Sequence, residues 1–131
     1  MFIILSLGFC LTTTNLFAQQ KTNFKTVSSA STCETVKYNL DYAVINNNKI
    51  EGATLLLIFR LGKGESSTKL TKLRMIGFES YIKLRDPNHK YIMAESARNE
   101  GLGKIEIYVG GKLEGELFMK KNKSGWDSCI E

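Results

Sequence analysis

The chain has 131 residues, 43% of them hydrophobic, and a formal net charge of +5. This length is enough for one domain that buries roughly two-thirds of the surface that its unfolded chain exposes, so one domain is expected. The N-terminal segment, residues 1–18, carries no charged side chain, and its apolar run is far too short to span a bilayer.

Residues 1–18 are typical of a secretory signal peptide, which we expect to be removed after Ala18. The missing basic residue near Met1 departs from the usual pattern, and a buried N-terminal strand or an uncleaved anchor is the alternative. The sequence predicts an exported protein, periplasmic or extracellular, that begins at Gln19 and has no transmembrane segment after cleavage. Residues 19–32, rich in Ser, Thr and Gln, are predicted to be a flexible leader, and residues 33–131 the domain.

Two cysteines, Cys33 and Cys129, remain after the signal peptide, since Cys10 lies within it. An even number of cysteines in an exported chain predicts a disulfide that joins the two ends of the domain. Two free thiols are the main alternative. A metal site is weaker, because only His89 is available to join the two thiols.

The first element expected is a half-buried strand over residues 36–44. Alternate residues there would share one face, namely Val36, Tyr38, Leu40, Tyr42 and Val44. Residues 46–48, three asparagines, predict a turn. Residues 49–62 are apolar on both faces through residues 55–59, which favours a central strand over a short buried helix.

The middle of the chain is harder to assign. We expect a loop to Ser67, then an irregular strand over residues 68–78, with a short helix as the alternative, and a strand over residues 80–85. Residues 86–89, Asp-Pro-Asn-His, predict a type I turn, and residues 90–94 another strand.

The hairpin at residues 104–119 is the clearest element of the sequence. Its first strand alternates Ile105, Ile107 and Val109 with polar residues and Tyr108. Gly110 and Gly111 supply the turn, and the return strand would place Leu113, Leu117 and Met119 on the apolar face. About seven short strands with almost no helix predict an all-β fold, an antiparallel immunoglobulin-like sandwich.

No arrangement of residues predicts catalysis or a cofactor. His89 lies in a predicted turn, where a solvated side chain is expected. Residues 62–67, GKGESS, lack the spacing of a phosphate-binding loop, and the pair Glu114 and Glu116 is expected to be solvated on a strand. The sequence therefore predicts a protein that is not an enzyme and binds no metal.

Basic residues concentrated between 69 and 90 are the feature with functional content. Lys72 with Arg74, and Lys83 with Arg85, are i, i+2 pairs that would share one sheet face if both segments were strands. Tyr81 and Tyr91 would flank this stripe. Together these six residues form the predicted binding site, for an anionic glycan, a lipid head group or an acidic protein surface. Export argues against nucleic acid, and a merely solubilising face is the alternative.

Three short runs in the last third of the chain resemble those of a known protein family. The runs YIMAES (91–96) and GKIEIYVGGKLEGE (103–116) and the turn SGW (124–126) resemble small exported bacterial β-sandwich proteins, including the soluble domain of MmpS-like transport accessory proteins. The likeness covers Tyr91 to Trp126, and more loosely Val36 to Phe59. It implies a β-sandwich. Residues 63–78, the two cysteines and the cleavable signal depart from the family pattern.

The function expected from the sequence is an exported, non-enzymatic binding or accessory module. It would contact an unidentified envelope protein or an anionic glycan or lipid surface through its basic face. The alternative is a structural or inhibitory partner protein, in which an edge strand adds to the sheet of another chain.

Overall fold

The structure, a computed structural model, describes residues 29–66, 68–126 and 129. The predicted signal peptide and residues 19–28 of the predicted leader lie outside the described residues. The described elements are α1 (Cys33–Asn48), β1 (Leu55–Arg60), α2 (Thr68–Arg85), β2 (Tyr91–Glu95), β3 (Gly103–Val109) and β4 (Lys112–Met119).

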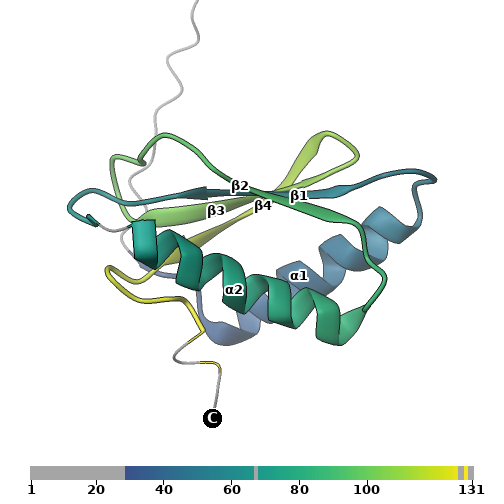
Figure 1. Ribbon diagram of the computed structural model, residues 1–131, viewed down its shortest axis with the longest axis horizontal. Coiled ribbons are helices and arrows are strands. Elements are labelled where there is room, and N and C mark those ends of the chain that lie inside the picture. Colours follow the sequence, from purple (N-terminus) through teal and green to yellow (C-terminus); the bar gives the residue numbers. More distant parts are fainter. Residues whose placement is uncertain (1–28, 67, 127–128, 130–131) are drawn as a thin grey trace, which may run out of the picture.

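The fold is a two-layer α/β arrangement in which both helices cover the same face of one sheet (Figure 1). The sheet has four strands in the order β2-β1-β3-β4. β1 and β2 are parallel, whereas β3 pairs antiparallel with both β1 and β4. Parallel neighbours need a long crossover, which α2 supplies. The predicted all-β, antiparallel immunoglobulin-like sandwich is therefore wrong, and so is the β-sandwich that the resemblance implied.

Residues 36–44 form part of α1 and not the predicted strand. Val36, Leu40 and Val44 fit both patterns, because positions four apart share a face in a helix and in a strand. Burial decides between them, since Ala43 lies in the core while Tyr38 is exposed. At the start of α1, the Thr32 hydroxyl accepts a hydrogen bond from the Thr35 backbone N–H, a helix N-cap.

Residues 68–78 and 80–85 form one continuous helix, α2, where two strands were the first choice. The central strand within residues 49–62 is confirmed as β1, and the strand at 90–94 corresponds to β2. The turn before β2 is confirmed too, because the His89 N–H donates to the Asp86 carbonyl.

The predicted hairpin is confirmed as β3 and β4, and Gly110 and Gly111 have φ of 56° and 78°. One residue was misplaced, since Leu113 is 51% exposed and not on the apolar face. A register shift between Ile107 and Tyr108 puts Leu113 opposite Tyr108, on the sheet face away from the helices.

The core lies between the sheet and the helices. Its sheet side is made by alternate residues of three strands: Leu55, Leu57, Phe59, Ile105, Ile107, Val109, Leu117 and Met119. The helices contribute Val36, Leu40, Ala43, Val44, Phe78 and Ile82.

Candidate functional site

Helix α2 is apolar on two sides, and only one of them is used by the core. Phe78 and Ile82 face the sheet and are fully buried. Leu73, Ile76 and Leu84 point outward and are 47%, 49% and 77% exposed. A helix that packs on one sheet face needs one apolar stripe, so the outer stripe is surplus to the fold.

The outer side of α2 forms one wall of an open groove with a volume of about 710 Å³. We call it the α2 groove. Its lining is mostly apolar and comprises Lys37, Leu70, Leu73, Ile76, Gly77, Ser80, Tyr81, Leu84, Asn122, Ser124, Trp126 and Cys129. Ligand pockets typically have this size and composition, with a few polar groups among apolar ones.

Trp126 is the aromatic centre of the groove wall. Its ring stacks on Tyr81 at 5.1 Å between centroids and meets the edge of Phe78 at 5.2 Å. It also lies so close to α2 that a Cβ at Gly77 would be 2.0 Å from the indole Cδ1. The position of the tryptophan ring therefore leaves no room for a side chain at Gly77. The buried indole N–H has no hydrogen-bond partner among the described residues.

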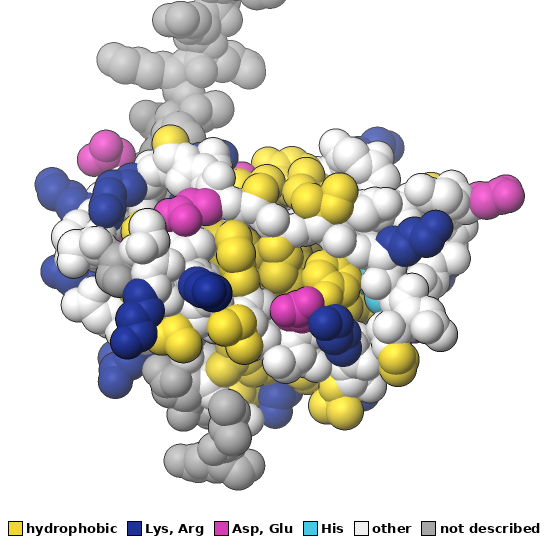
Figure 2. Space-filling model, viewed as in Figure 1, with side chains coloured by type: hydrophobic (Ala, Val, Ile, Leu, Met, Phe, Trp, Pro, Cys, Tyr) yellow, Lys and Arg dark blue, Asp and Glu magenta, His cyan; other side chains and the backbone are white. Residues whose placement is uncertain are grey.

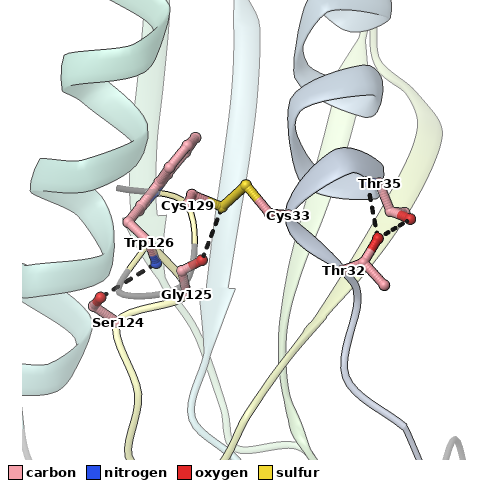
Figure 3. Close-up of a disulfide and its surroundings, with 7 residues drawn as sticks. All are labelled: Thr32, Cys33, Thr35, Ser124, Gly125, Trp126 and Cys129. Carbon is pink, nitrogen blue, oxygen red and sulfur yellow. Dashed lines mark hydrogen bonds between the residues drawn. A yellow bond between two sulfur atoms is a disulfide. The ribbon is translucent and has the colours of Figure 1, made fainter. Parts of the chain in front are cut away.

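The disulfide between Cys33 and Cys129 is confirmed, with 5.3 Å between the Cα atoms. It ties the segment that carries Trp126 to the first turn of α1, and Figure 3 shows Trp126 between this bond and α2. The Cys129 Sγ atom also contacts the Gly125 carbonyl. The bond therefore holds the groove wall opposite α2.

A buried ion pair, Glu65 with Arg74, organises the end of the molecule where α2 begins. Both side chains are almost fully buried, and the guanidinium donates to both carboxylate oxygens at 2.9 and 2.7 Å. Glu65 also accepts from the backbone N–H groups of Gly62 and Asn122. Burial by itself raises the pKa of Glu65, but these four donors outweigh it and hold the pKa below its usual value.

The same pair brings together loops that are far apart in sequence. Arg74 donates to the backbone carbonyls of Lys120 and Lys123, and Arg98 donates to those of Gly62 and Glu65. The β1–α2 loop, the loop after β2 and the segment after β4 therefore meet at the start of α2.

These loops and the start of α2 gather cations into what we call the basic end, with side chains Lys63, Lys69, Lys72, Arg98, Lys120, Lys121 and Lys123. Dark blue side chains crowd the left end of the molecule in Figure 2, over the start of α2 and the neighbouring loops. The first turn of α2 holds no acidic residue. Glu95, which accepts from Thr71, and Glu100, next to the Gly101 that bonds Lys63, lie at the margin.

The predicted basic stripe is wrong, because its residues lie on a helix. Side chains two apart on a helix point about 200° away from each other, so each predicted pair is split. Lys72 is exposed whereas Arg74 is buried against Glu65. Likewise, Lys83 pairs with Glu79 at 2.8 Å, while Arg85 turns toward α1 and pairs with Asp41 at 2.7 Å.

The two predicted tyrosines are also separated. Tyr81 lies in the α2 groove, where its hydroxyl donates to Asp41. Burial and this hydrogen bond raise the pKa of Tyr81, so it stays a neutral donor. Tyr91 begins β2 and donates to Glu79. Of the predicted binding residues, only Lys72 joins the basic end as an exposed cation, and only Tyr81 lines the groove.

One other sequence interpretation needs correction. His89 is buried, with its ring nitrogens near the Asn47 amide and the Asp86 carboxylate at 3.4 and 3.3 Å, and not solvated. Residues 62–66 form a loop, as expected, and this loop carries the buried Glu65. Within the described residues, His, Cys, Asp and Glu form no group of three that could hold a metal ion.

Comparisons with protein-family models, with curated proteins and with solved structures find no match for this chain. None of the described helices combines the length and apolar character needed to cross a membrane. The site must therefore be interpreted from its own geometry.

Proposed function

We propose that this protein is an exported, non-enzymatic binding module that contacts an anionic envelope surface through its basic end. The observation that supports this proposal most directly is that cations from three loops converge around the start of α2. Each cation near an anionic lipid surface is worth about 1 kcal/mol at moderate salt, so several together give useful affinity.

The buried Glu65–Arg74 pair supports this proposal. Because it bonds the backbone of residues 120, 122 and 123, it fixes this segment without using the side chains of Lys120 and Lys123. The helix N-terminus adds partial positive charge at the same end. The predicted signal peptide and the disulfide are both consistent with a protein that acts outside the cytoplasm.

The test is cosedimentation with vesicles that contain anionic lipid. The triple variant Lys120→Glu, Lys121→Glu and Lys123→Glu should lose binding, and wild-type binding should weaken steeply as salt rises. The matched control is Lys49→Glu, Lys90→Glu and Lys112→Glu, three exposed lysines at the opposite end of the sheet. Both triples change the formal net charge by −6, from +5 to −1.

The control triple should retain most of the binding. Equal loss in both triples would mean that net charge alone drives the association, and the proposal would fail. Binding to an anionic polysaccharide but not to the vesicles would assign the basic end to a glycan.

A second candidate function is edge-strand addition at β2. This strand pairs only with β1 among the described strands, and it lies at the edge of the sheet. Ile92 beside that edge is 55% exposed. Lys90 and Ser96 bond to β1 through their backbones, so position 93, at an odd offset from both, turns its N–H toward the free edge. A proline at position 93 should abolish association with a partner protein if a strand of that partner pairs with β2, and should leave it unchanged if the basic end is the contact.

A further inference from the structure

We infer that the α2 groove binds the acyl chain of a single-chain anionic amphiphile, such as a long-chain carboxylate, with its head group toward the basic end. This deepens the proposed function, since it rests on the same basic end and names a ligand class. It adds a site that the charge argument alone does not predict.

The dimensions of the groove suit one acyl chain. Leu70 and Leu84, at its two ends, are 14 residues apart on α2, which corresponds to about 21 Å along the helix axis. The hydrocarbon thickness of one bilayer leaflet is roughly 15 Å, so a membrane-type acyl chain fits lengthwise. The volume of about 710 Å³ is open along one side and lies within the range of small-molecule pockets.

The walls of the groove are apolar along most of this length. Leu73, Ile76 and Leu84 offer aliphatic surface, and Trp126 with Tyr81 offers a stacked aromatic wall. Burying an acyl chain against them is favourable by the same hydrophobic effect that drives folding. The polar lining residues Asn122 and Ser124 come from the segment that also carries Lys120, Lys121 and Lys123.

Charge complementarity selects an anionic head group. Lys37 lines the groove from the α1 side. Lys69 lies four residues before Leu73 and seven before Ile76, so it shares their helix face. Two nearby carboxylates are engaged by other side chains, Glu65 by Arg74 and Asp41 by Arg85 with Tyr81. The described lining residues of the groove include the cation Lys37 and no carboxylate.

The test uses Trp126, which is the only tryptophan of the chain and part of the groove wall. Dibromostearate, whose bromines quench tryptophan on contact, is titrated below its critical micelle concentration. We expect saturable quenching. A cationic amphiphile with a chain of equal length should compete at least about tenfold more weakly, because the rim is basic.

The groove variant is Ile76→Glu with Leu84→Glu, which places carboxylates on exposed positions and leaves the core unchanged. It should raise the apparent Kd for dibromostearate at least about tenfold, since acyl burial beside a charge is costly. The matched control is Ile92→Glu with Leu113→Glu, two half-exposed apolar residues on the other face of the sheet. It should bind as wild type does.

These assays test the groove proposal and the basic-end proposal independently. The groove variant should still sediment with anionic vesicles, and the Lys120, Lys121, Lys123 variant should still show quenching, with weaker affinity. Absence of saturable quenching in the wild type, or equal affinity in the groove and control variants, would overturn the inference. Self-association that the groove variant abolishes, without quenching by the amphiphile, would overturn it in favour of a second copy of the chain.

Discussion

The two apolar sides of α2 differ in what surrounds them, not in their composition. The inner side, with Phe78 and Ile82, is enclosed by the sheet and α1, and each side chain there contributes to folding. The outer side, with Leu73, Ile76 and Leu84, faces the groove and remains about half or more exposed. An amphipathic pattern identifies a helix with one buried face, whereas a second stripe identifies a surface available to a ligand. We therefore expect changes on the two sides to separate stability from binding.

The largest effect should come from removing the disulfide that anchors the outer wall. The double variant Cys33→Ser and Cys129→Ser releases a closure of 96 residues, which the chain-entropy model values at about 4 to 5 kcal/mol of unfolding free energy. Urea denaturation measures the loss. A change below about 1 kcal/mol would show that packing of Trp126 holds the C-terminal segment without the bond.

Breaking the buried ion pair should cost nearly as much. Arg74→Met leaves the Glu65 carboxylate buried without its main partner, which destabilises by about 3 to 5 kcal/mol. Adding Glu65→Gln should recover much of this loss, because the remaining group is then neutral. Urea midpoints of the single and double variants provide the comparison, and additive losses would contradict a direct coupling between the two side chains.

The Glu65–Arg74 pair also predicts a pH dependence. Because the pKa of Glu65 is lowered in the folded state, its contribution is complete above the unfolded value of roughly 4.3. It is lost as the pH falls through the folded value. The stability difference between wild type and Glu65→Gln should therefore shrink below about pH 4, as measured by urea denaturation from pH 7 to 3. A constant difference over that range would contradict a lowered pKa of Glu65 in the folded state.

On the inner side, Phe78→Ala should destabilise by about 3 to 5 kcal/mol, because it removes a fully buried ring that contacts Phe59 and Trp126. Its counterpart on the outer side, Leu84→Ala, should stay within about 0.5 kcal/mol of wild type. Thermal and urea unfolding check both. Similar losses in the two variants would remove the distinction between the sides.

Adding a single methyl group to α2 where it contacts Trp126 should cost less stability than Phe78→Ala and more than Leu84→Ala. Gly77→Ala gains helix propensity of up to about 1 kcal/mol but drives a methyl group into the indole. A net loss of about 1 to 3 kcal/mol is expected, together with a shift in tryptophan emission. The control Ser80→Ala, on the same side of α2, should change neither the stability nor the tryptophan emission. A Gly77→Ala variant that is more stable than wild type would show that the indole ring moves freely.

The sequence predicted those parts of the fold whose local signals have one interpretation. Gly110 and Gly111 specify a hairpin, and a proline at the second position specifies the Asp86–His89 turn. The two cysteines of the predicted domain are each other's expected partner. The helices were missed because residues four apart satisfy both periods. In α1 the exposed Tyr38 and the buried Ala43 resolve the ambiguity only once burial is known.

The candidate site was predictable only in part, for the same reason. The density of lysines indicated a cationic surface, but the strand assignment placed it on a sheet. Pairs such as Lys72 and Arg74 lie on opposite sides of a helix, so one became a surface cation and the other a buried partner of Glu65. The groove depends on Trp126 reaching Gly77, a contact between residues 49 positions apart that no local pattern indicates.

The most direct test of the account is the unfolding free energy of the triple variant Leu73→Ser, Ile76→Ser and Leu84→Ser, measured together with dibromostearate quenching. All three residues belong to the outer side, so their loss should change stability by no more than about 1.5 kcal/mol in total, while saturable quenching disappears. A loss of stability comparable to that of Phe78→Ala, or unchanged quenching, would show that the outer side serves the fold and is not a binding surface.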